Sequence, residues 1–170
     1  MRLPGVVLGL TLPLAAAQDR AMPAPGSPLE ALDRGAHRCF AAQELLLCQV
    51  SDAARLRIEG VPVRARILAY RGGRLERVTT IVDEARFAEL LSALESRWGP
   101  GGRSTERLRA GMGGVFPNLM VTWRFEGRVA LLEQYYERVT QSALSVMAPA
   151  AFDVYMSERE RQRAGGMRDL

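Results

Sequence analysis

Few residues of this chain have the types and spacing that catalysis or metal binding requires. His37 is the only histidine. A zinc site with two histidine ligands is therefore excluded, and a Ser-His-Asp or Cys-His arrangement would have to use His37. It stands two positions from Cys39, a spacing at which side chains rarely face each other productively. We expect a surface histidine, no catalytic residue and no metal site.

Cys39 and Cys48 are the only cysteines. No Cys-x-x-Cys is present, so the sequence does not support thiol-disulfide exchange of the thioredoxin kind. In an exported chain an even pair predicts a disulfide, and closing a loop of about ten residues would stabilise the fold by roughly 2–3 kcal/mol. The alternative is that Cys48 is a small buried apolar residue with a free thiol. We favour the disulfide.

A glycine-rich segment comes closest to a phosphate-binding loop. It lacks the Lys-Ser/Thr of a P-loop, and it precedes a strand instead of opening a helix, so we expect no cofactor. One interpretation is a flexible joint between two halves of the chain. The other is a loop that folds over a groove and binds a partner or ligand, because exposed Met and Phe suit adaptable binding. The candidate binding residues are Arg109, Met112, Gly113, Gly114, Val115 and Phe116.

Acidic residues give a weaker signal. Glu133 and Glu137 would lie about 13 Å apart on a strand, too far for the carboxylate pair of a glycosidase. Glu126 or Glu133 as a general base remains an alternative, for an enzyme of unrecognised type. The run 158–163 alternates in charge and has no apolar stripe, which predicts a solvated helix end.

A hairpin is the clearest element that would position such residues. Apolar residues alternate with polar ones over 61–69, the period of a half-buried strand. Arg71–Arg74 contains two glycines, which accept the positive φ of a tight turn. The return strand, 75–82, is predicted to place Val78, Thr80 and Val82 on the face of Val63, Ala65 and Ile67. Shorter strands are expected at 44–50 and 55–58, joined across Ser51-Asp52.

Helices are expected on either side of this hairpin. Ser27 to Glu30 reads as the capped start of a short helix. Asp83 is predicted to cap a second helix, whose apolar residues recur at steps of three and four up to Trp98 before Gly99 and Pro100 end it. Residues 100–118 are predicted to form a long connection. A second hairpin through Glu126-Gly127, a strand at 142–147 and a last helix from Pro149 would follow.

These elements predict an α+β fold: an antiparallel sheet of hairpins with amphipathic helices packed on one face. A helical bundle and a doubly wound parallel sheet are disfavoured. We divide the chain into a signal peptide (1–17), a flexible leader (18–26), a single α+β domain (27–164) and a disordered tail (165–170).

The N-terminal segment predicts export. Arg2 precedes an uncharged apolar run, and three alanines at 15–17 precede polar residues, as in a secretory signal peptide cut after Ala17. The mature protein would then be periplasmic or extracellular, without a stable membrane span. All 23 basic residues are arginine, against 19 acidic residues. Because the arginines are spread among the acids, we expect no nucleic-acid partner.

Several motifs together resemble small exported bacterial proteins of unknown function. The shared pattern is a hairpin from Gly60 through Gly73, an amphipathic helix that ends at Trp98-Gly99-Pro100, and a Trp-bearing hairpin around Trp123 and Arg128–Leu131. The similarity covers about two thirds of the chain and is carried by folding signals. It implies no catalytic residue.

The expected function is therefore that of a non-enzymatic protein that binds a protein or an envelope component. The 100–118 connection and the adjacent sheet edge are the expected contact. The alternatives are a small-molecule carrier, with an apolar pocket between helix 84–98 and the sheet, and the carboxylate-dependent enzyme described above. The oligomeric state stays open.

Overall fold

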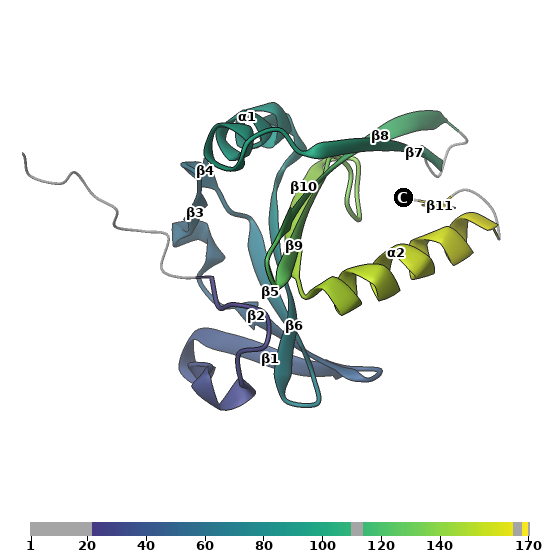
Figure 1. The fold of residues 1–170 in the computed structure, drawn as a ribbon. Coiled ribbons are helices and arrows are strands. Elements are labelled where there is room, and N and C mark those ends of the chain that lie inside the picture. Colours follow the sequence, from purple (N-terminus) through teal and green to yellow (C-terminus); the bar gives the residue numbers. More distant parts are fainter. Residues whose placement is uncertain (1–21, 110–113, 165–167, 170) are drawn as a thin grey trace, which may run out of the picture.

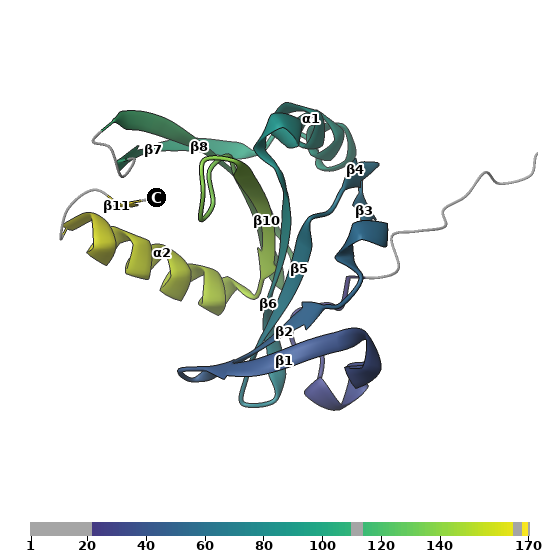
Figure 2. The same cartoon turned by 180° about the vertical axis from the view of Figure 1, so that it is seen from behind.

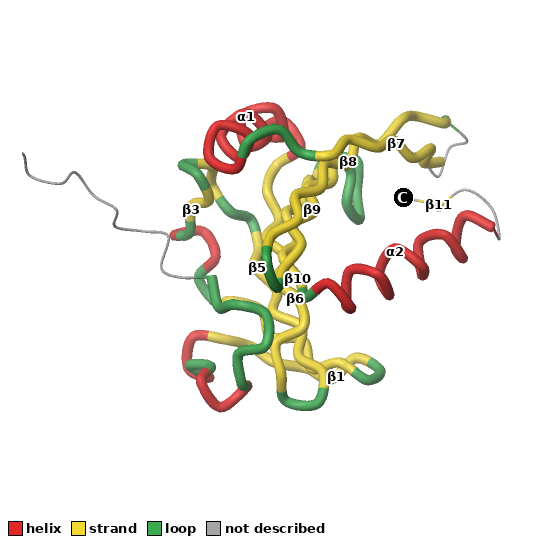
Figure 3. The backbone as a smooth tube through the Cα atoms, viewed as in Figure 1, coloured by secondary structure: helices red, strands yellow, loops and turns green. Residues whose placement is uncertain are grey.

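The computed structural model describes residues 22–109, 114–164 and 168–169. Strands supply most of the fold, as Figures 1 and 3 show. The strands are β1 (His37–Ala42), β2 (Leu45–Val50), β3 (Arg57–Ile58), β4 (Val61–Pro62), β5 (Ala65–Arg71), β6 (Arg74–Asp83), β7 (Gly102–Arg109), β8 (Val115–Phe125), β9 (Arg128–Glu133), β10 (Gln141–Met147) and β11 (Arg168–Asp169). The helices are α1 (Phe87–Trp98), α2 (Pro149–Ala164) and short 3-10 turns at Leu29–Ala31, Arg34–Ala36, Ala53–Arg55 and Glu84–Arg86.

One sheet organises these elements. Over the described ranges it has nine strands in the order β1-β2-β5-β6-β10-β9-β8-β7-β11, and β3 and β4 form a separate ribbon. Neighbouring strands of the sheet are antiparallel except β11, which runs parallel to β7. The predicted α+β class with an antiparallel sheet is confirmed. β11 lies within residues 165–170, for which we expected a disordered tail.

The two α-helices lie on opposite faces of the sheet (Figures 1 and 2). On β9, Ala130 and Leu132 belong to the core cluster that contains α1, whereas Val129 and Leu131 pack with Phe152 of α2. Successive residues of a strand point to opposite faces, so β9 is apolar on both sides. The expectation that the helices cover one face is wrong.

The Gly72-Gly73 hairpin is confirmed, but its predicted faces are not. Both glycines have positive φ, 55° and 76°, as a tight turn between β5 and β6 requires. Val78 pairs with Leu68, and Ile81 with Ala65. Val78 and its neighbours at steps of two therefore face away from Ala65. A register irregularity after Ala69 shifts the pairing, and β6 is buried on both faces, so alternation alone does not reveal the register.

The predicted C-terminal end of α1 is confirmed, but the predicted N-terminal caps are not. Gly99, with φ 80°, ends α1, and its N–H donates to the Glu95 carbonyl at 2.9 Å. Asp83 does not cap a helix; its carboxylate pairs with Arg64 instead. The helix expected from Ser27 is only a 3-10 turn over Leu29–Ala31. The Ser27 hydroxyl donates to the Ala24 carbonyl at 2.7 Å and does not cap that turn.

The long connection expected at 100–118 is wrong, because most of it pairs as β7 and the first part of β8. β1 is an edge strand that the sequence did not reveal. It pairs with β2. The strands expected at 44–50 and 55–58 are present as β2 and β3 and follow each other along the chain, but β2 pairs with β1 and β5, and β3 with β4. The second hairpin, through Glu126-Gly127, has Trp123 opposite Ala130 and is confirmed.

The core is divided between the faces. One cluster fills the space between the sheet and α1, and a second lies beneath α2. A third, around Leu68 and Val78, is covered by the N-terminal segment through Leu29 and Leu32. Met22 and Gly26 belong to the predicted flexible leader (18–26). Met22 packs on the core, and the Gly26 N–H donates to the Leu75 carbonyl at 2.7 Å.

Candidate functional site

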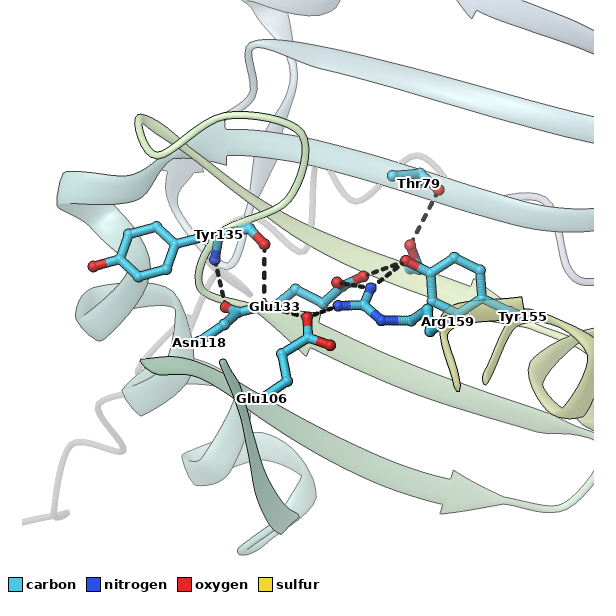
Figure 4. Close-up of polar contacts among 8 residues, drawn as sticks. Thr79, Glu106, Asn118, Glu133, Tyr135, Tyr155 and Arg159 are labelled. Carbon is cyan, nitrogen blue, oxygen red and sulfur yellow. Dashed lines mark hydrogen bonds and ion pairs between the residues drawn. The ribbon is translucent and has the colours of Figure 1, made fainter. Parts of the chain in front are cut away.

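A buried charged cluster joins α2 to the sheet (Figure 4). The guanidinium of Arg159 contacts the carboxylates of Glu106 on β7 and Glu133 on β9. All three side chains are at most 4% exposed. The Tyr155 hydroxyl donates to Glu133 at 2.7 Å, and the Asn118 amide donates to Glu106 at 2.9 Å. The ion pairs and hydrogen bonds hold α2 in a fixed position on β7, β8 and β9.

Strand register and helical period build this cluster. Glu106 pairs with Asn118 in the β7–β8 ladder, so both side chains point to the α2 side of the sheet. Tyr155 and Arg159 are four residues apart and therefore share one face of α2. The Tyr155 ring also lies 5.2 Å from the guanidinium carbon of Arg77 on β6.

Burial and charge shift the pKa values of the cluster. Burial, assisted by the charge of Glu133, raises the pKa of the Tyr155 hydroxyl above its ordinary value. Burial alone would lower the pKa of Arg159, but the negative charges of Glu133 and Glu106 outweigh it and raise that pKa. Tyr155 therefore stays protonated and Arg159 charged at neutral pH. The expectation of a solvated end for residues 158–163 is wrong at Arg159.

On the side of the sheet where α2 packs, the helix does not cover β1, β2 and β5, the strands on the far side of β6 from β10. Phe40 pairs with Leu47, and Leu47 with Ala69, so these side chains share the face on which α2 packs. Figure 2 shows β1 and β2 below α2, with the turn between them on the same side of the sheet as the helix. Phe40 is 52% exposed, and Val154, which α2 contributes to the groove described next, is 49% exposed. We call this surface the open face: Phe40, Leu45, Leu47, Ile67 and Val154.

A groove of about 600 Å³ runs between α2 and the β1–β2 turn at the margin of the open face. Leu45, Ala69 and Val154 contribute apolar lining. Arg71 pairs there with Glu44 at 2.5 Å and with Glu76 at 3.1 Å. The groove is large enough for part of a peptide or a small ligand.

A smaller cavity of about 250 Å³ lies on the opposite side of the sheet, at the C-terminal end of α1. Leu94 and Trp98 of α1, Phe125 of β8 and Val146 of β10 line it, and residues 22–25 close one side. The Trp98 ring meets Trp123 and Phe125 edge to face, with ring centroids 5.5 and 5.3 Å away. The cavity lies where an apolar pocket between helix 84–98 and the sheet was considered.

The described residues of the predicted binding loop lie at the paired ends of β7 and β8. Arg109 ends β7, Gly114 is exposed and Val115, which opens β8, is 42% exposed. The Phe116 ring packs edge to face on Tyr135 at 5.0 Å. Met112 and Gly113 lie outside the described residues.

The remaining candidates are separate from one another. Cys39 and Cys48 face each other across β1 and β2 and form a disulfide, as predicted. The ring of His37 is hydrogen-bonded to the Asp33 carbonyl at 2.7 Å. Glu133 is fully buried at the end of β9, whereas Glu137 is exposed in the loop after it. Sequence reasoning missed Glu106, Asn118 and Arg159. The β-pairing of residues 102–109 would have linked Glu106 to Asn118, but not to Arg159 of α2.

Comparison with protein-family models, with curated proteins and with solved structures gives no significant match. Within residues 22–109, 114–164 and 168–169, no helix is long and apolar enough to cross a membrane. The same ranges contain no group of three or more His, Cys, Asp or Glu side chains placed to hold a metal ion.

Proposed function

We propose that this chain is a non-enzymatic, exported binding protein whose open face receives a segment of a protein partner. The observation that carries the proposal is the incomplete cover of one sheet face. There α2 covers β7 to β10 but does not reach Phe40, which is about half exposed. Val154 of α2 is also about half exposed and lines a groove of about 600 Å³. Clustered apolar side chains with a polar rim are typical of protein interaction sites.

The lining of the groove indicates the chemistry of the partner. It carries three acidic residues, Glu44, Glu76 and Glu158, and two basic residues, Arg71 and Arg77. The formal charge of the lining is thus −1, and Leu45, Ala69 and Val154 add apolar side chains to it. A partner segment with an apolar side chain followed by a basic residue would be complementary to it.

The burial of Glu133 supports a binding role over catalysis. A general base must reach the proton that it abstracts, within hydrogen-bond distance or through one water molecule. Glu133 is fully buried and already contacts Arg159 and Tyr155. Glu126, the other carboxylate considered as a base, is exposed at the β8–β9 turn.

Capture with matched valine variants tests the proposal. The full chain would be used as bait in an envelope extract, and bound proteins quantified by mass spectrometry. Val154→Asp should reduce recovery of the specific partner at least about tenfold, since it places a charge in an apolar contact. Val139→Asp is the control, because Val139 is 46% exposed and Val154 49%. Equal recovery with both variants would contradict a role for the open face.

Val115→Asp tests the earlier prediction that the β7–β8 loop makes the contact. Loss of the partner with this variant, and not with Val154→Asp, would transfer the site to the loop.

Export has its own test, the intact mass of the protein recovered from the producing cells. A mature chain that begins at Gln18 is expected. An uncleaved chain recovered from the cytosol would contradict it.

A further inference from the structure

The cavity at the C-terminal end of α1 has the form of a ligand pocket. Its volume is about 250 Å³. An apolar protein cavity of roughly 150 Å³ already binds benzene. The apolar lining includes Ile58, Leu94, Trp98, Phe125 and Val146. A ligand with an apolar body somewhat larger than benzene would fit.

The charges around this cavity favour an anion. The lining contains Arg97, Arg128 and one carboxylate, Glu59, which gives it a formal charge of +1. Arg97 donates to Glu59, so that pair is neutral overall. Arg128 lies over the Phe125 ring, 5.1 Å from its centroid, and is not ion-paired with any residue that the structure describes. Arg128 is also an exposed residue, so a solute can reach its guanidinium.

We propose that this cavity binds a small amphipathic carboxylate, with the apolar body against Trp98 and Phe125 and the carboxylate on Arg128. An arginine already stacked on an aromatic ring loses little freedom when it binds, and its planar fork matches a carboxylate. The site lies on the α1 side of the sheet, away from the open face. It is therefore independent of the proposed protein partner.

Tryptophan fluorescence of the full chain provides the test, with octanoate as the probe. Trp98 and Trp123 are the only tryptophans, Trp98 lines the cavity, and their rings lie 5.5 Å apart. Octanoate should give a saturable change in emission, and 1-octanol, which lacks the charge, should bind at least about tenfold more weakly.

Two arginine variants form a matched pair. Arg128→Gln should weaken octanoate binding about tenfold, and Arg128→Lys should weaken it less, because the charge remains although the planar fork is lost. Arg124→Gln is the control, since Arg124 also lies over a phenylalanine, 4.8 Å from the centroid of Phe152, but on the α2 side of the same hairpin. It should bind octanoate like the unchanged protein.

Three results would overturn the proposal. An emission that does not change with octanoate would remove the site. Equal affinities for octanoate and octanol would remove the carboxylate. An equal loss in Arg128→Gln and Arg124→Gln would show that Arg128 has no specific role. The thermal unfolding midpoint of each variant, which should match that of the unchanged protein, separates lost binding from lost folding.

Discussion

Arg159 of α2 forms a buried ion pair with Glu133, the last residue of β9. Neither side chain is more than 4% exposed, and the Tyr155 hydroxyl donates to the same carboxylate. The pair fixes the helix over the second half of the sheet. The groove beside the open face depends on that placement, because α2 forms one of its walls.

Replacing Arg159 should therefore strongly destabilise the protein. Arg159→Met leaves the carboxylates of Glu106 and Glu133 without their shared cation, and loss of one partner from a buried pair costs about 3–5 kcal/mol. Urea unfolding of the variant and of the unchanged protein would measure this loss of unfolding free energy. Arg161→Met is the control, since Arg161 is exposed on the same helix and should change stability by less than about 0.5 kcal/mol. Similar losses in the two variants would contradict the role of the cluster.

Tyr155 should make stability fall at high pH. Its pKa is raised from 10.0 in the folded protein, so the native state holds this proton more tightly than the unfolded chain does. The stability that it contributes is complete below the unfolded pKa and is lost as pH rises above about 10. In Tyr155→Phe, urea midpoints should fall less between about pH 9 and pH 11. Parallel declines in the two proteins would rule out this linkage.

Gly101 is expected to tolerate no side chain. A Cβ there would lie 2.5 Å from Cγ1 of Val121 and 2.8 Å from Cε2 of Trp123. Gly101→Ala should destabilise the protein by about 1–3 kcal/mol and alter the tryptophan emission. The neighbouring Gly102→Ala is the control, since its nearest contact would be the Thr122 carbonyl at 3.7 Å. A Gly101→Ala protein as stable as the unchanged protein would show that the contact with Trp123 is not close.

The disulfide should stabilise the protein measurably. Cys39→Ala opens the link between β1 and β2 and should lower the unfolding free energy by roughly 2–3 kcal/mol. Thiol titration of the denatured, unreduced protein should detect no free thiol. Two titratable thiols in the native preparation would contradict the pairing.

The parts of the fold that the sequence predicts correctly are those encoded by neighbouring residues. Gly72-Gly73 and Glu126-Gly127 mark turns between strands, and the spacing from Phe87 to Trp98 marks α1. The signals are local because a tight turn and a helical stripe each need only a few consecutive positions.

The missed elements depend on distant partners. β7 reads as polar, and Glu106 and Leu108 become buried only because α2 and β8 approach them. β1 exposes Phe40, so its pattern resembles a loop. Arg159 lies in a run of alternating charge, and its burial follows from two carboxylates on strands 26 and 53 residues away. No local pattern contains that information.

Photo-crosslinking at position 154 tests the central claim most directly. A benzophenone amino acid would replace Val154, and in a parallel protein Val139, which has a similar exposure of 46% against 49%. After illumination in the compartment where the protein resides, position 154 should give one discrete protein adduct and position 139 none. No adduct at 154, or the same adducts at both positions, would contradict a partner on the open face.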